Sequence, residues 1–225
     1  MKVYAEYFDI DGIKYRTNTL LQFGNSWKLI GNVVLANPGS AEPLEKLDDA
    51  ELLNVKNFYD NFECRELNLS NWHKFSEDAT MQRVAKIFNG WYIDADNLIN
   101  LNGVIQLFNT FNVKNQNLSE AVEKLPPENF LLYSIGVEKF FNDKPTYFGF
   151  SGDVLNDEKL KDVAEQIFLN SSNNVRSLYY SDFDKNSFYH PTYINRANKQ
   201  PHFVNYKDNM LKKLLEQVKK ELNGK

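Results

Sequence analysis

An apolar run that breaks abruptly into turn residues is the feature that most constrains the fold of this chain. Residues 31–36 read Gly-Asn-Val-Val-Leu-Ala, and Asn37-Pro38-Gly39-Ser40 follow directly. Apolar runs of this length, bounded by turn residues, are typical of buried parallel strands. In open α/β sheets, ligands bind just beyond the carboxyl ends of such strands. The sequence therefore predicts a sheet buried on both faces, with Asn37 and a sharp turn at the edge where ligands bind.

The same pattern recurs along the chain, with helical patterns in between. Buried strands are predicted at 31–36, 104–108, 146–150 and 175–180. Amphipathic or capped helices are predicted at 47–62, 79–91, 119–125, 128–141, 157–169 and 206–222. Asp78 and Asn156 are expected to cap two of these helices, and Pro127 suits the first turn of another. Alternation of strands and helices builds a parallel sheet with right-handed crossovers.

The expected fold class is therefore α/β, a three-layer α/β/α sandwich around a four-stranded parallel sheet. An N-terminal β-hairpin is expected to be added to it, because residues 2–9 and 13–23 alternate in polarity on either side of Asp11-Gly12. No internal repeat or long linker divides the chain. We expect one domain over 1–225, with the hairpin in 1–25 and a C-terminal helix in 205–225.

The composition excludes several classes of protein. With 42% hydrophobic and 25% charged residues among 225, the chain is globular rather than disordered. No run approaches the roughly 20 apolar residues of a membrane helix, and the first residues lack the apolar core of a signal peptide. We expect a cytoplasmic protein with no membrane partner. The oligomeric state does not follow from the sequence.

Metal and cofactor chemistry finds no support in the motifs. Cys64 is the only cysteine, which excludes an internal disulfide and a cysteine-ligated iron–sulfur cluster. The chain has no P-loop, no dinucleotide fingerprint and no zinc-type spacing of Cys and His. We expect no metal and no organic cofactor. The net charge of −4 argues mildly against strong binding of nucleic acid, which depends on clustered Lys and Arg.

The first candidate motif is the turn after the first buried strand. Pro38 keeps Asn37 out of the helical region of backbone space, and Gly39 permits a turn that a β-carbon would block. Such a turn can aim the Asn37 amide and neighbouring N–H groups, with Ser40, into a cleft. The alternative is an ordinary connection from strand to helix.

The second candidate motif is the strand Gly103-Val104-Ile105-Gln106-Leu107-Phe108-Asn109, followed by Thr110-Phe111. Asn109 lies at or just past the end of this strand. Its amide offers two donors and an acceptor side by side, which suits the edge of a pyrimidine. The alternative is an asparagine that caps the strand end.

The third candidate motif is His190-Pro191-Thr192-Tyr193, after the predicted fourth strand. A neutral imidazole can donate a hydrogen bond to an oxygen that gains negative charge in a transition state. The alternative is a histidine packed among the flanking tyrosines. Ser151-Gly152-Asp153, after the third strand, can supply backbone donors to a ligand or cap a turn.

Together the three motifs resemble those of the uracil-DNA glycosylase superfamily. Asn37-Pro38-Gly39 is similar to the Asn-Pro-Gly form of the first motif of this superfamily. The strand that ends in Asn109 is similar to the strand that reads uracil, and His190-Pro191-Thr192 is similar to the His-Pro-Ser motif. A closer resemblance is to an uncharacterised bacterial family of this fold. That family has a Tyr-Arg pair (here Tyr15-Arg16), Asn-Pro-Ser-Thr-Ala, Asn-Leu-Phe and His-Pro-Leu-Tyr.

The resemblance implies roles for single residues. Asn37 would position a water and His190 would donate to the leaving base, as the two catalytic groups. Pro38, Gly39, Ser40, Asn109, Phe111, Ser151 and Tyr193 would bind the substrate, with Phe111 or Tyr193 stacked on the ring. Arg196 and Lys199 would contact nucleic acid. The chain has no Pro-Pro-Ser loop of the kind that compresses the DNA backbone in this superfamily.

Three functions remain open at this point. The protein can hold a nucleobase, a nucleotide or single-stranded nucleic acid without chemistry. It can be an N-glycosidic hydrolase that excises bases from single-stranded or mismatched DNA. It can also be a non-catalytic interaction module, which many exposed aromatic residues around 178–193 would favour.

Overall fold

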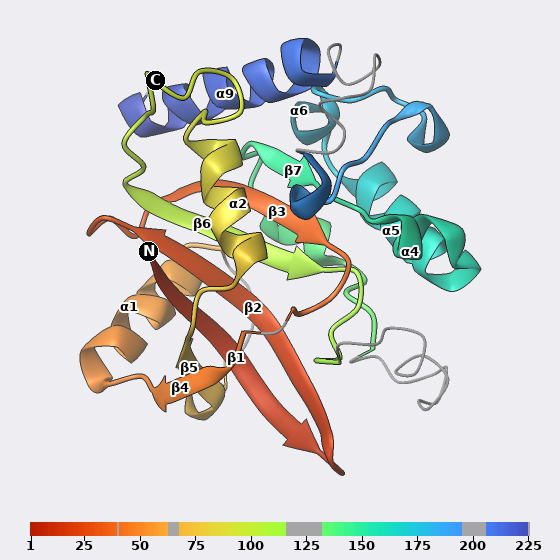
Figure 1. The fold of residues 1–225 in the computed structure, drawn as a ribbon. Helices are drawn as coiled ribbons and strands as arrows, with labels where there is room; N and C mark the ends of the chain where they lie inside the picture. Colours follow the sequence, from red (N-terminus) through yellow and green to blue (C-terminus); the bar gives the residue numbers. More distant parts are fainter. Residues whose placement is uncertain (40, 63–67, 116–131, 195–205, 225) are drawn as a thin grey trace.

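The structure, a computed structural model, describes residues 1–39, 41–62, 68–115, 132–194 and 206–224. Within these residues seven strands form one sheet in the order β4-β5-β1-β2-β6-β3-β7 (Figure 1). The strands are β1 (Lys2–Ile10), β2 (Ile13–Phe23), β3 (Leu29–Leu35), β4 (Pro43–Lys46), β5 (Trp72–Phe75), β6 (Gly103–Asn109) and β7 (Thr146–Phe148). β3 pairs in parallel with β6 on one side and β7 on the other, and the other neighbours pair antiparallel. The sheet is therefore mixed.

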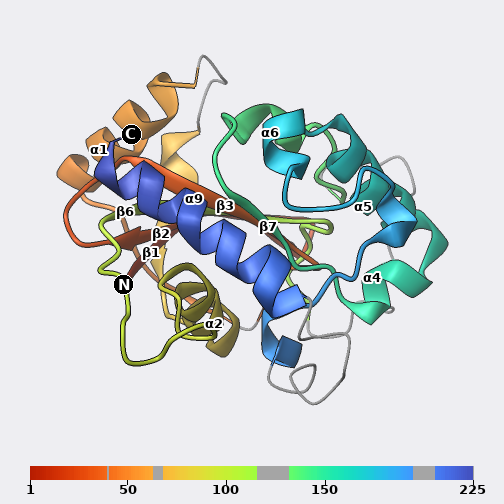
Figure 2. The ribbon, with the colours of Figure 1, turned by 90° about the horizontal axis from the view of Figure 1, so that it is seen from above.

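Helices cover both faces of this sheet (Figures 1 and 2). The α-helices are α1 (Asp49–Asp60), α2 (Ala79–Phe88), α4 (Gly152–Asn156), α5 (Glu158–Asn170), α6 (Asn173–Arg176) and α9 (Lys212–Asn223). Short 3-10 turns lie at Leu69–Asn71, Val137–Phe140, Phe183–Lys185 and Pro191–Tyr193, and a π-helical turn at Lys207–Leu211 leads into α9.

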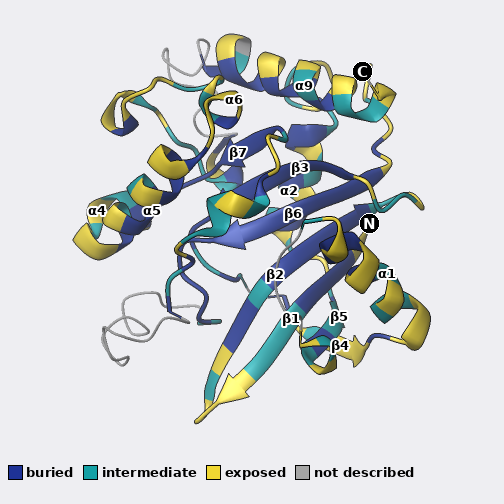
Figure 3. Cartoon of the chain, turned by 180° about the vertical axis from the view of Figure 1, so that it is seen from behind, coloured by how far each residue is buried: buried dark blue, intermediate teal, exposed yellow. Residues whose placement is uncertain are grey.

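Alternate side chains of the central strands supply the hydrophobic cores on the two faces of the sheet. Val33 packs in one core with residues of α2 and α9, whereas Val34 packs in the other with residues of α5. Tyr4 of β1 packs with α1 on the same face as α5. Every residue of β3 and β6 is buried (Figure 3), as expected for strands covered on both faces. The predicted three layers of helix, sheet and helix are therefore present.

The prediction of a fourth parallel strand at 175–180 is wrong. Residues Asn173–Arg176 form α6 instead, and Ser172 caps this helix by accepting a hydrogen bond from the N–H of Val175. Most residues around Val175 are polar, and a strand inside a doubly covered sheet must be apolar on both faces. The parallel part of the sheet thus has three strands, β6, β3 and β7, among the described residues.

The predicted N-terminal hairpin is confirmed, but it is not an appendage. Asp11 (φ 53°) and Gly12 (φ 81°) form its turn, with the two positive φ angles that tight hairpins favour. β2 pairs with β6 and β1 pairs with β5, so the hairpin lies in the middle of the sheet. The short strands β4 and β5 were not predicted.

The helix predictions vary in accuracy. Helices predicted at 47–62, 79–91, 157–169 and 206–222 correspond to α1, α2, α5 and the η5–α9 segment. Asp78 caps α2 as predicted, whereas Asp157 rather than Asn156 caps α5. The helix at 119–125 and Pro127 lie outside the described residues. The helix predicted at 128–141 is not found in the described part of that range, which forms turns and the 3-10 turn Val137–Phe140. Gly136 takes a left-handed conformation (φ 83°) immediately before this turn, and a regular helix does not pass through that conformation.

A bulge in β2 changes which face its side chains occupy. Tyr4 pairs with Leu20 but Glu6 pairs with Thr17, so β2 has one residue more than β1 between these pairs. Asn18 within the bulge has a φ of +48°, and its Nδ2 donates to Glu6 Oε2 at 2.7 Å. A one-residue slip moves every following side chain to the opposite face. Arg16 therefore lies on the same face as Leu21, over the ring of Phe75, although the two are five residues apart.

Candidate functional site

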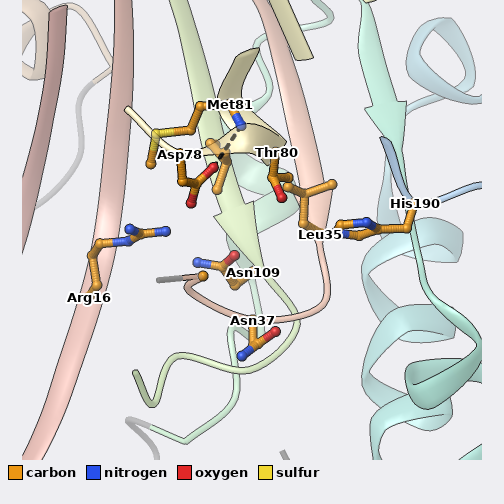
Figure 4. Close-up of a pocket in the computed structure, with 10 residues that line it drawn as sticks. Arg16, Leu35, Asn37, Asp78, Thr80, Met81, Asn109 and His190 are labelled. Atoms are coloured by element: carbon orange, nitrogen blue, oxygen red, sulfur yellow. Dashed lines mark hydrogen bonds between the residues drawn. The ribbon is translucent and has the colours of Figure 1, made fainter. Parts of the chain in front are cut away.

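A cavity opens at the carboxyl ends of β3 and β6, beside the N-terminus of α2 (Figure 4). It is lined by Arg16, Leu35, Asn37, Gly39, Asp78, Thr80, Met81, Leu107, Asn109 and His190. Its volume is about 100 Å³. Drug-sized and cofactor sites occupy roughly 300–1,000 Å³, whereas one water needs about 10–15 Å³. The cavity therefore suits a single small ring rather than a dinucleotide.

The parallel pairing of β3 with β6 brings two of the predicted motifs together. Leu35 and Asn109 are register partners at the strand ends. The pairing continues into the loops, where Thr110 N–H donates to Leu35 O at 2.7 Å and Phe111 N–H donates to Ala36 O at 2.9 Å. The turn after β3 and the end of β6 are thus held side by side, as the sequence predicts for parallel strands.

Asn109 lines this cavity and carries a buried, unsatisfied side-chain acceptor. Its side chain is 2% exposed, and its Oδ1 has no hydrogen-bond partner in the described part of the chain. A buried acceptor without a donor costs about 1–3 kcal/mol. Such a group in a native protein calls for an explanation, and a ligand N–H at this position supplies one.

Arg16 reaches the same cavity from β2. Its side chain is 2% exposed, and its Nε and Nη1 are buried without a hydrogen-bond partner among the described residues. Burial lowers the pKa of Arg16 to about 10, and the carboxylates of Asp78 and Glu42 act against this shift. The guanidinium therefore stays charged at neutral pH. In Figure 4 it points toward Asp78 and Asn109.

Asp78 brings a carboxylate to the wall of the cavity. Its Oδ1 accepts the N–H of Met81 at 2.8 Å and so caps α2. The turn after β3 approaches this carboxylate closely, since a β-carbon on Gly39 would lie 2.7 Å from Asp78 Oδ2. Glycine at position 39 is thus explained by contact with Asp78, in addition to turn formation.

His190 faces the cavity as a neutral imidazole. Burial lowers its pKa from 6.5 to about 4, although the Asp78 carboxylate acts against this. Its Nδ1 accepts the backbone N–H of Thr192 at 3.4 Å and lies 2.8 Å from Thr192 Oγ1. Because a backbone N–H can only donate, the ring proton is assigned to Nε2. His190 thus has a neutral N–H available for donation.

Asn37 lines the cavity, but its amide nitrogen is used elsewhere. Nδ2 donates to the backbone oxygens of Asn115 at 3.0 Å and Pro38 at 3.3 Å. In Figure 4 the side chain points away from Arg16 and Asn109. Its Oδ1 is the atom left to act on a water or ligand.

The other residues predicted for the site lie in different surroundings. Pro38 is buried beneath the turn, and Phe111 is 0% exposed in the core that includes α5, so neither lines this cavity. Ser151 is the residue before α4 and has a buried Oγ without a partner among the described residues. Tyr193 is 44% exposed, and its ring contacts that of His190 at 6.0 Å between centroids. Ser40, Arg196 and Lys199 lie outside the described residues.

Sequence reasoning missed two charged residues of the cavity. Arg16 was noted only as part of the resemblance, because regular alternation along β2 gives no sign that it faces the ligand edge of the sheet. Asp78 was recognised only as a helix cap. Its position in the chain offered a signal, since the N-terminus of a helix beside a strand end commonly contributes to ligand sites.

Searches within the described residues give two negative findings. No group of three or more His, Cys, Asp or Glu side chains is placed to hold a metal ion, and no helix has the length and apolar character needed to cross a bilayer. Comparison of the chain with protein-family models, curated proteins and solved structures finds no match.

Proposed function

We propose that this cavity recognises a nucleobase, either free or as part of a nucleotide or single-stranded nucleic acid. The observation that carries this proposal is the unsatisfied Oδ1 of Asn109 in a buried cavity the size of one ring. An asparagine amide places an acceptor beside two donors. A nucleobase edge with a ring N–H beside a carbonyl is complementary to this pair of groups.

The remaining groups support a ring ligand rather than a flexible one. Leu35, Leu107 and Met81 give the cavity apolar walls. Ligand sites typically combine apolar walls with a few polar groups that fix orientation. Here those polar groups are Arg16, Asp78, Asn109 and His190.

A second candidate function, hydrolysis of an N-glycosidic bond, is favoured by the state of His190. Its neutral imidazole can donate Nε2–H to a carbonyl oxygen of a base that leaves with the electron pair of the glycosidic bond. A water held by Asn37 Oδ1 would attack the sugar carbon. This candidate requires that single-stranded oligonucleotides containing uracil accumulate abasic sites with the wild type but not with His190→Ala. An interaction module is less favoured, because Phe183 is buried and Tyr179 and Phe188 pack partly buried against the core, which leaves Tyr180 and Tyr193 as the exposed aromatic residues of this segment.

Binding of free bases tests the proposal directly. In calorimetric titrations with uracil, cytosine, adenine and guanine, we expect at least one base to bind. We expect Asn109→Leu to lower the affinity for that base by about tenfold or more, since the variant leaves the ligand N–H unpaired. The matched control is Asn57→Leu, which makes the same change at an exposed position of α1.

The two variants distinguish a specific role of Asn109 from a general effect of the substitution. Loss of affinity in Asn109→Leu but not in Asn57→Leu supports recognition of the base by Asn109. Equal affinity in both variants, or no binding of any base or nucleoside to the wild type, would refute the proposed function.

A further inference from the structure

Arg16 is a buried charge without a direct counter-charge. It forms no ion pair in the described ranges, and its Nε and Nη1 lack hydrogen-bond partners there. Phe75 contacts it only through its ring face, at 5.5 Å from the centroid. Removing a charge from water without pairing it is costly. This cost is hard to explain by stability alone.

The nearby carboxylates each interact with another group, although only one oxygen of Asp78 is used in this way. Glu42 pairs with Lys114 Nζ, and Asp78 Oδ1 accepts the N–H of Met81 at the N-terminus of α2. The partial positive charge of that helix end offsets part of the charge on Asp78. The cavity therefore keeps a positive site at Arg16, although Asp78 lies on its wall.

The backbone is distorted at the position that aims Arg16 into the cavity. The β2 bulge contains Asn18 at φ +48°, a conformation that non-glycine residues adopt at a cost. The hydrogen bond from Asn18 to Glu6 holds it. Without the extra residue, Arg16 would point to the opposite face of the sheet. Bulges that re-aim a side chain are over-represented next to active sites.

We propose that Arg16 binds a negatively charged ring oxygen of the ligand, so that the cavity prefers an anionic heterocycle to a neutral ring of similar size. This inference rests on the proposed function and adds the charge of the ligand to it. Figure 4 shows Arg16, Asp78 and Asn109 directed toward one space. An anionic oxygen at Arg16 pairs the guanidinium, while a ring N–H meets Asn109 Oδ1.

The test compares two ligands that differ mainly in charge. Uracil is neutral at pH 7, whereas barbiturate has the same ring with one more oxygen and is an anion. We expect barbiturate to bind the wild type about tenfold to hundredfold more tightly, because hydrogen bonds between charged groups are the stronger ones. This preference should disappear in Arg16→Met and persist in part in Arg16→Lys. The control is Lys159→Met, which removes a positive charge at an exposed position of α5 and should leave the preference unchanged.

The outcomes distinguish this inference from the proposed function. If uracil binds through Asn109 but barbiturate binds no better, or if Arg16→Met keeps the preference, Arg16 is not the anion-binding group and the proposed function still stands. If neither uracil nor barbiturate binds, this inference fails, whereas the proposed function fails only if cytosine, adenine, guanine and the nucleosides do not bind either. If Arg16→Met does not fold, the ratio of the uracil and barbiturate dissociation constants is compared between the wild type and Arg16→Lys instead. A wild type that binds both ligands equally well contradicts the inference.

Discussion

Individual buried polar side chains define the candidate site more clearly than any sequence motif. Asn109 Oδ1 and the guanidinium of Arg16 are buried and lack partners in the described part of the chain, and His190 is held neutral by burial. The two unpaired groups, Asn109 Oδ1 and the Arg16 guanidinium, are costly to bury without a partner and become favourable when a complementary ligand pairs them. At this scale, these are the groups that the proposed ring ligand would pair.

The state of His190 predicts a pH dependence of stability. Because burial lowers its pKa from 6.5 to about 4, the unfolded chain binds a proton that the folded chain does not, and the folded state loses stability as pH falls from 6.5 toward 4. The full effect is about 3 kcal/mol. Most of this loss falls between pH 7 and pH 4.5, and urea denaturation at these two pH values measures it.

The difference between wild type and His190→Gln isolates this effect from the carboxylates that titrate in the same range. We expect the variant to lose less stability between the two pH values than the wild type does. Equal losses would mean that burial does not lower the pKa of His190 and would contradict the account of it as a buried imidazole.

At the scale of elements, the site depends on how closely β3 and α2 approach each other. Gly31 of β3 allows this approach, since a β-carbon there would lie 2.4 Å from Phe88 Cε1 of α2 and 2.9 Å from Pro145 O. α2 in turn carries Asp78, Thr80 and Met81 to the cavity. Displacing α2 from the sheet would therefore change the site as well as the core.

Gly31→Ala tests this dependence. We expect a loss of unfolding free energy of about 1–3 kcal/mol from overpacking, measured by urea denaturation. Gly152→Ala is the matched control, because its β-carbon would meet only Asn156 Nδ2, at 3.8 Å, at the start of α4. A Gly31→Ala variant as stable as the control would show that α2 can move away from β3 without cost.

The same elements show what the sequence can and cannot predict. β3 and β6 were found because strands covered on both faces are apolar throughout, and the turn at Asn37 and the end at Asn109 followed from parallel pairing. The strand expected at 175–180 failed because polar residues surround Val175, and Ser172 caps a helical turn there that takes up the start of the predicted strand. Arg16 was missed because the bulge that reverses its face leaves no mark in the pattern of polarity.

At the scale of the whole molecule, size and charge limit the ligand. The cavity has a volume of about 100 Å³, which limits the proposed ligand to one ring, and the net charge of −4 gives little general attraction for a polyanion. A free base, a nucleotide or a single exposed base of an unpaired strand fits these limits better than duplex DNA, which would add the cost of base flipping. The ends of β3 and β6 and the N-terminus of α2 together fix the positions of the residues that line this cavity.

A crystal structure of the protein with barbiturate or uracil tests the central claim most directly. We predict one ring in the cavity between the ends of β3 and β6, with a ring N–H within hydrogen-bond distance of Asn109 Oδ1 and a ring oxygen within hydrogen-bond distance of the Arg16 guanidinium. A saturating ligand that leaves this cavity empty, or that binds there without contacting Asn109, would contradict the account.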